Sequence, residues 1–162
     1  MSIVTVEFRI DLVHDQGIEE LDEAMVAARI AAGNIISLRE EEALDGVLRI
    51  GTAEICDELT PAVHRLCFDA VSALVIDGSV FDYPYFSSTE NAHLRSVGDM
   101  VALTGSDVPE STFPRRDLLC ALYDCGGRWI AMLDQVGRGL EADRLRQFAA
   151  STHVALVAAG LA

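Results

Sequence analysis

The sequence predicts a single α+β domain with a mixed or antiparallel sheet and a helix-rich C-terminal half. Its 162 residues fit one domain, and 51% of them are hydrophobic, which is enough to fill a core. Segments with strand-like and helix-like hydrophobic periods follow one another along the chain. No repeat, low-complexity tract or linker interrupts residues 1–162, so the whole chain is expected to form one compact unit.

The first two predicted elements are a strand and a helix. Residues 4–12 alternate strictly between apolar and polar side chains, which is typical of a strand with one buried face. Residues 18–32 place apolar side chains at three- and four-residue steps, which predicts a helix that ends at Gly33.

A hairpin and a second helix are predicted next. Strands at 34–40 and 47–56 would flank an acidic loop, because Asp45-Gly46 is a good turn signal. Thr60-Pro61 would open a helix that runs to Val75. The order strand, helix, strand, strand, helix becomes ferredoxin-like if residues 79–85 form a further strand.

The second half of the chain has weaker periodicity. Residues 93–103 are expected to be extended, and residues 113–125 to form a helix closed by Gly126-Gly127. Residues 140–150 also favour a helix. Two segments stay open between strand and helix: 128–136 and 152–158.

The charge excludes several classes of function. The chain has 26 acidic and 12 basic residues, all of the latter arginine, for a net charge of −14. This balance opposes binding to nucleic acid or to an anionic membrane surface, both of which need a basic footprint. The absence of lysine excludes Schiff-base catalysis, a P-loop lysine and a kinase lysine.

Neither a signal peptide nor a membrane span is predicted, and the cysteines do not suggest a disulfide framework. A reduced, cytoplasmic protein is therefore expected. Cys56, His64 and Cys67 could be imagined as zinc ligands, but no CxxC or HxxxH pair supports them. Cysteines in the core are the more ordinary reading, so neither a metal nor a cofactor is predicted.

The acidic residues are concentrated in the first 60 positions, which carry a net charge of −10. A solvated surface with acidic helix starts would explain such clusters. The alternative is a surface that attracts and docks a basic partner, and the concentration of charge favours it. The candidate binding residues are Glu19, Glu20, Glu23, Glu40, Glu41, Glu42, Asp45, Asp57 and Glu58.

An aromatic run at residues 81–86 is the second candidate feature. Side chains at alternate positions of a strand would pack into the core. If exposed, Tyr83, Tyr85 and Phe86 would instead anchor a partner, since aromatic residues are typical of interfaces.

No nucleophile, zinc-protease, dinucleotide or Walker motif is present, so no catalytic residue is predicted. The first hypothesis is accordingly a non-enzymatic acidic protein that neutralises a basic partner, as a bacterial toxin immunity protein or a small nuclease inhibitor would. A second is a small enzyme whose catalytic residues are dispersed, with His14, His64 and His93 as candidate acids or bases. A third is a homo-oligomeric structural or regulatory module, and a homodimer is compatible with each hypothesis.

Overall fold

The computed structural model describes residues 3–162, which form a single α+β domain of two four-stranded antiparallel sheets followed by two long helices. The first sheet, sheet A, has the order β2-β1-β3-β4, and the second, sheet B, has the order β5-β6-β7-β8. The strands are β1 (Val6–His14), β2 (Gly17–Asp22), β3 (Asp45–Ile50), β4 (Ala53–Glu58), β5 (Val80–Pro84), β6 (Asn91–Val97), β7 (Met100–Gly105) and β8 (Val108–Pro114).

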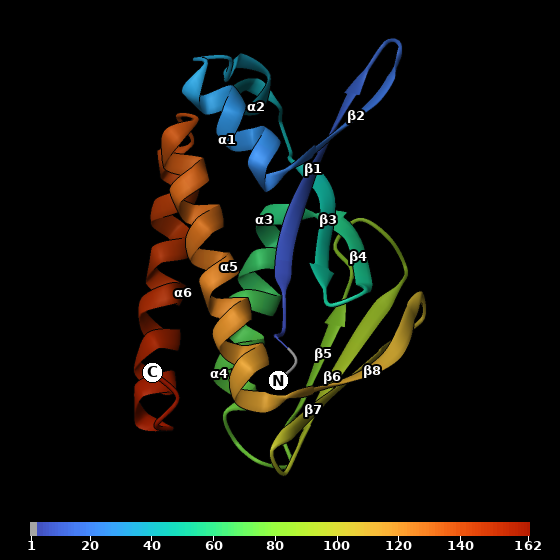
Figure 1. Ribbon diagram of the computed structural model, residues 1–162, viewed down its shortest axis with the longest axis vertical. Helices are drawn as coiled ribbons and strands as arrows, with labels where there is room; N and C mark the ends of the chain where they lie inside the picture. The colour runs from blue at the N-terminus through green and yellow to red at the C-terminus, as the bar shows by residue number, and fades with distance from the viewer. Residues whose placement is uncertain (1–2) are drawn as a thin grey trace.

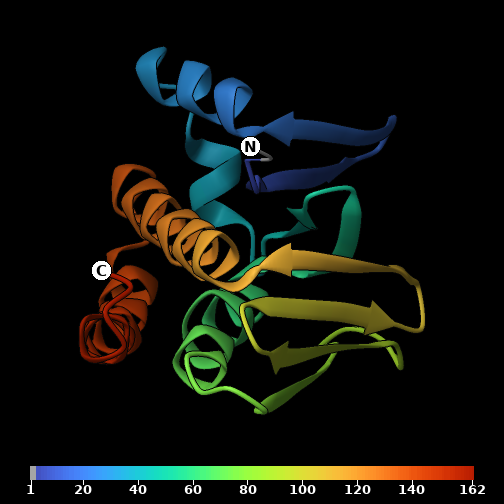
Figure 2. The same ribbon diagram turned by 60° about the horizontal axis from the view of Figure 1, so that its bottom comes forward.

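The helices lie on one side of the strands. They are α1 (Glu23–Ala31), α2 (Ile36–Glu40), α3 (Leu59–Ala62), the π-helical segment η1 (Val63–Asp69), α4 (Ala70–Leu74), α5 (Arg115–Gln135) and α6 (Gly139–Ala158). Figure 2 shows the strands of both sheets in one curved layer, in which β4 lies beside β8. The helices cover one face of this layer, and no helix covers the other face within residues 3–162. The molecule therefore has two layers, and each sheet keeps one face open to solvent (Figures 1 and 2).

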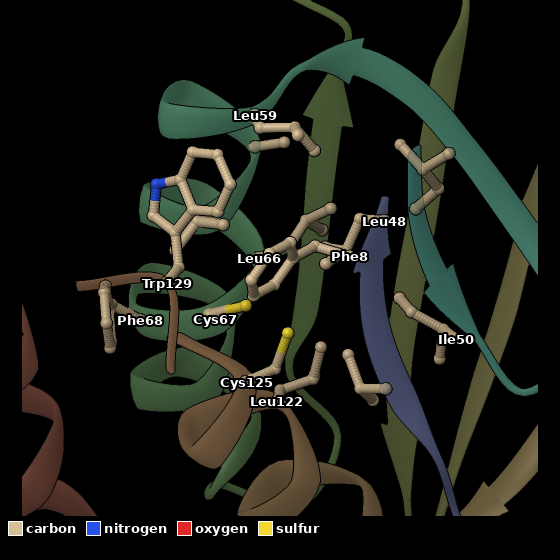
Figure 3. Packing of buried hydrophobic residues seen from close by; sticks show 14 of the residues in the cluster. Phe8, Leu48, Ile50, Leu59, Leu66, Cys67, Phe68, Leu122, Cys125 and Trp129 are labelled. Atoms are coloured by element: carbon tan, nitrogen blue, oxygen red, sulfur yellow. The ribbon is translucent and has the colours of Figure 1, made fainter. Parts of the chain in front are cut away.

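The alternation predicted for the first strand is confirmed. Phe8, Ile10 and Leu12 point to the helices and are almost completely buried, whereas Glu7 and Val13 point outward. Phe8 meets the edge of the Trp129 ring from α5, with the ring centroids 4.9 Å apart (Figure 3). The core thus lies between the inner face of the strands and the helices η1 and α5.

The predicted helix over residues 18–32 is wrong in its first part. Gly17, with φ +132°, turns the chain so that residues 17–22 pair with β1 as strand β2. The helix α1 begins only at Glu23, where the Asp22 carboxylate accepts a hydrogen bond of 2.8 Å from the amide of Met25. The pairing of residues 17–22 with β1 therefore outweighs the helix-like spacing of their apolar side chains.

The predicted hairpin around Asp45-Gly46 is also wrong, and with it the ferredoxin-like order. Residues 36–40 form the short helix α2, and the hairpin of β3 and β4 turns at Gly51, where φ is +61°. Gly46 instead lies inside β3. Only glycine fits there, because a Cβ atom would collide with the carbonyl oxygen of Arg9. The glycine serves strand packing rather than a turn.

Later elements agree more closely with expectation. The helix from Thr60 is found as the continuous run α3, η1 and α4, and residues 93–103 are extended, with Gly98 in the turn between β6 and β7. The two open segments, 128–136 and 152–158, are helical. Gly126-Gly127 does not end α5: a Cβ at Gly126 would lie 2.6 Å from the Phe68 ring, so this glycine admits close contact with η1.

Candidate functional site

The outward face of sheet A is the most strongly charged surface that the register defines. Residues paired across antiparallel strands point to the same face, so the pairing identifies its members. We call this surface the acidic sheet face. It holds two arginines, Arg9 and Arg49, and seven acidic residues: Glu7, Asp11, Glu20, Asp22, Asp45, Glu54 and Glu58.

Two pairs of carboxylates are directly opposed on this face. Asp11 lies opposite Glu20 across β1 and β2, and Asp45 lies opposite Glu58 across β3 and β4. Like charges in this position destabilise a sheet unless a cation lies between them.

Arg9 neutralises the first pair. Its Nε atom donates to Oδ1 of Asp11 at 2.9 Å, and its Nη2 atom lies 3.6 Å from Oε1 of Glu20. The hydrogen bond to Asp11 raises the pKa of the guanidinium. Arg49 similarly donates to Glu54 at 2.9 Å. Three of the seven carboxylates of the acidic sheet face, those of Asp11, Glu20 and Glu54, are therefore paired with an arginine.

The second pair is not compensated. Within residues 3–162, neither Asp45 nor Glu58 has an ion pair with a basic side chain. Partial burial raises the pKa of Glu58, and the charges of Asp45, Asp57 and Glu141 raise it further. The positive charge of Arg138 partly offsets this effect, but Arg138 is bonded to Glu141, with its Nε atom 2.8 Å from Oε1. Excess negative potential consequently remains at this corner of the face.

The loop before Asp45 extends this negative region. Glu40, Glu41 and Glu42 are exposed and lead directly into β3. Arg138 reaches this loop, but it donates to backbone oxygen atoms, at 2.6 Å to the carbonyl of Glu41, rather than to the carboxylates. Glu40, Glu41 and Glu42 thus lie next to Asp45 along the chain, and the charge of Glu141, from α6, acts on Glu58.

Glu19 and Glu23 lie away from this corner, on the side of the sheet that carries the helices. Glu19 pairs with Arg29 and lies 3.1 Å from His14, and hydrogen bonds from His14 and Arg29 lower its pKa. Glu23 accepts a 2.8 Å hydrogen bond from Arg128. Each carboxylate has its own cation, so neither adds to the unpaired charge.

Asp57 points into the protein and is only 4% exposed. It accepts hydrogen bonds from the Tyr83 hydroxyl, from the amide of Phe86 at 2.8 Å and from the amide of Ser87 at 2.9 Å. Burial alone would raise the pKa of Asp57, but the hydrogen bonds from Ser87 and Tyr83 lower it. This carboxylate fastens the loop after β5 to the end of β4 and is not available to a partner.

The aromatic run divides between core and surface. Tyr83 and Tyr85 are buried, with ring centroids 5.6 Å apart, and burial raises the pKa of Tyr85 to about 12. Phe86 is 68% exposed, and its amide is held by Asp57, the residue before Glu58. Of the three candidate aromatic residues, only Phe86 is exposed at the surface, and its backbone is held by Asp57 at the end of β4.

The histidines do not gather into an acid–base site in the described part of the chain. His93 lies 2.5 Å from Asp82, but both side chains are well exposed on sheet B. His64 stacks on Phe148 with ring centroids 3.8 Å apart, and His14 lies at the tip of the β1–β2 hairpin. Over residues 3–162, no group of three His, Cys, Asp or Glu side chains has the geometry to hold a metal ion.

Several residues of this surface were not among the sequence candidates. Glu7, Asp11, Asp22 and Glu54 join it through strand register, and Glu141 joins it from a helix 83 positions after Glu58. The alternation of β1 placed Glu7 and Asp11 on a wet face and was the signal that could have found those two. The approach of α6 has no local signature.

The chain matched no protein-family model, no curated protein and no solved structure when it was compared with each. Among residues 3–162, none of the helices combines the length and the apolar character needed to span a bilayer.

Proposed function

We propose that the protein is a non-enzymatic binding protein that captures a basic protein partner on the acidic sheet face, centred on Asp45 and Glu58. The observation that carries this proposal is the opposition of these two carboxylates without a cation between them. A small inhibitor of a basic nuclease, such as a toxin immunity protein, would use such a surface to occupy the groove meant for phosphate.

The energetics favour an arginine or lysine from a partner at this corner. In the free protein, the repulsion around Glu58 is an unfavourable term, and an incoming cation would relieve it. Complementary charge also accelerates encounter between the two proteins. Phe86, in the loop that Asp57 fastens to the end of β4, supplies an exposed aromatic side chain, and aromatic residues are frequent binding hot spots.

Binding can be tested by calorimetry with purified basic nucleases, including the product of any toxin-like gene beside this protein's own. We expect a complex at low salt that weakens at least roughly tenfold near physiological ionic strength. The double variant Asp45→Asn/Glu58→Gln should bind at least about tenfold more weakly. The control Asp99→Asn/Glu110→Gln removes the same charge from two exposed positions, in the β6–β7 turn and on β8, and should bind almost normally.

Cys56 provides a local readout of where a partner sits. It is exposed on the outward side of β4, opposite Val47, whereas Cys67 and Cys125 are buried. A partner on the acidic sheet face should slow alkylation of Cys56 and leave Cys120 unaffected. The absence of any complex at low salt, or binding that leaves Cys56 fully reactive, would refute the proposal.

A further inference from the structure

Two cysteines that are far apart in the sequence meet in the core between η1 and α5. Cys67 lies on η1 and Cys125 lies on α5, 58 positions later, and both side chains are completely buried. The two thiols share a hydrogen bond, and Figure 3 shows their sulfur atoms directed at each other. Neither residue belongs to the acidic sheet face, so this contact is a separate feature of the molecule.

The backbones of η1 and α5 approach closely at this point. A Cβ atom at Gly126, the residue after Cys125, would lie 3.0 Å from the Cβ atom of Cys67. The amide of Gly126 also donates a hydrogen bond to the Cys67 sulfur. A disulfide needs its two Cα atoms within about 7 Å of each other, and a glycine at position 126 permits such an approach of the two helices.

We infer that Cys67 and Cys125 are a redox-active dithiol that forms an intramolecular disulfide and so joins η1 to α5 covalently. The other two cysteines are placed elsewhere. Cys56 is exposed on the outward side of β4, and Cys120 donates to the carbonyl of Leu161 at 3.4 Å. This inference does not depend on the proposed function.

The reaction is a thiol–disulfide exchange with a low-molecular-weight disulfide such as oxidised glutathione. The thiolate of one cysteine attacks the small disulfide, which gives a mixed disulfide and releases one small thiol. The thiolate of the other cysteine then displaces the second small thiol and forms the bond between Cys67 and Cys125. The cysteine pair loses two electrons and two protons, both of which pass to the small thiols.

The exchange is expected to be slow. Burial and the hydrogen bond with Cys125 raise the pKa of the Cys67 thiol, so little of the reactive thiolate is present at neutral pH. Because both sulfur atoms lie in the core, the small disulfide reaches them only when η1 and α5 open locally. The position of the equilibrium, rather than the rate, is therefore the informative measurement.

The variant Cys56→Ser/Cys120→Ser isolates the buried pair for this measurement. It is equilibrated in glutathione redox buffers, once folded and once in urea, and the disulfide is quantified by acid quenching, alkylation and peptide mapping. We expect the ratio of disulfide to dithiol to be about a hundredfold higher in the folded chain, because the fold already holds the two thiols in contact. The oxidised form should also unfold at a higher urea concentration than the reduced form.

The matched control is Cys67→Ala/Cys120→Ser, which keeps the same number of cysteines but leaves Cys56 and Cys125, and it should show no such preference in the folded state. Circular dichroism shows whether each variant is folded, and the Cys56→Ser/Cys120→Ser chain decides the question by itself if the control is not. A disulfide ratio no higher in the folded chain than in urea overturns the inference. So does an oxidised form that unfolds at a lower urea concentration than the reduced form, because the two thiols would then have to leave their native positions to react.

Discussion

Asp45 and Glu58 face each other across β3 and β4 on the open side of sheet A, and no basic side chain among residues 3–162 forms an ion pair with either. The Asp11–Glu20 pair on the same sheet has Arg9 between its carboxylates. The repulsion between Asp11 and Glu20 is therefore compensated by Arg9, whereas the repulsion between Asp45 and Glu58 is not compensated. Repulsion that is retained in a folded protein is relieved when a cation binds, so this contrast locates the expected contact.

The first prediction concerns the stability of the free protein. Glu58→Gln should raise the free energy of unfolding by roughly 0.5 kcal/mol at pH 7, because it removes one of two opposed like charges. The folded pKa of Glu58 is raised, so its destabilising effect is present above that pKa and disappears as the carboxylate becomes protonated. The advantage of Glu58→Gln in urea unfolding should therefore shrink as the pH falls toward 4.

Glu54→Gln is the control for this experiment, since Glu54 lies on the same strand and face but is bonded to Arg49. This variant should gain no stability. An equal gain in both variants would mean that overall charge, not the opposition of Asp45 and Glu58, sets the effect.

A second prediction concerns Asp57, whose hydrogen bonds are directed at the loop that follows β5. Asp57→Asn should lower the free energy of unfolding by about 3 kcal/mol, because an amide nitrogen would then face buried donors. Tyr83→Phe removes one donor and should cost about 1 kcal/mol. Guanidinium unfolding at pH 7 measures both values.

The pH dependence of Asp57 has the opposite sign to that of Glu58. Its folded pKa is lowered, so it stabilises the protein above its unfolded pKa, and this contribution is lost as the pH falls through the folded pKa. The difference between wild type and Asp57→Asn should narrow below about pH 4. A difference that stays constant down to pH 3 would show that Asp57 acts through packing rather than through its charge.

The sequence was most informative where a pattern is local. The alternation in β1 predicted both the buried side chains and the wet face that carries Glu7 and Asp11. The acidic loop near Glu41 was correctly expected at the surface, although the element before it is a helix rather than a strand.

Pairing between distant residues could not be predicted. The opposition of Asp45 and Glu58 depends on a turn at Gly51, and the sequence placed that turn at Asp45-Gly46. The compensation of Glu23 depends on Arg128, which is 105 positions away. Charge clustering along a chain thus gives the location of acids but not which of them meet cations, since that depends on tertiary contacts.

A third prediction compares the two adjacent glycines in α5. Gly126→Ala should destabilise the protein by about 2 kcal/mol, because its Cβ would overlap the Phe68 ring in the packed core. Gly127→Ala has open space around it and should stabilise the protein by about 0.5–1 kcal/mol through helix propensity. We expect the two variants to shift the unfolding temperature in opposite directions. If both variants raised the unfolding temperature, the close contact between Gly126 and the Phe68 ring of η1 would be contradicted.

A fourth prediction tests the arginine that joins α6 to the acidic loop. The Arg138 side chain is 8% exposed, bonds to Glu141 and donates to the carbonyls of Leu38 at 3.2 Å and Glu41 at 2.6 Å. Arg138→Met leaves those groups without a donor and should cost about 3 kcal/mol. Amide exchange in α2 should become faster, because this arginine holds the end of that helix against α6. Arg39→Met, which removes an exposed arginine from the same helix, should change neither quantity, and equal effects from the two variants would show that net charge rather than this contact orders the loop.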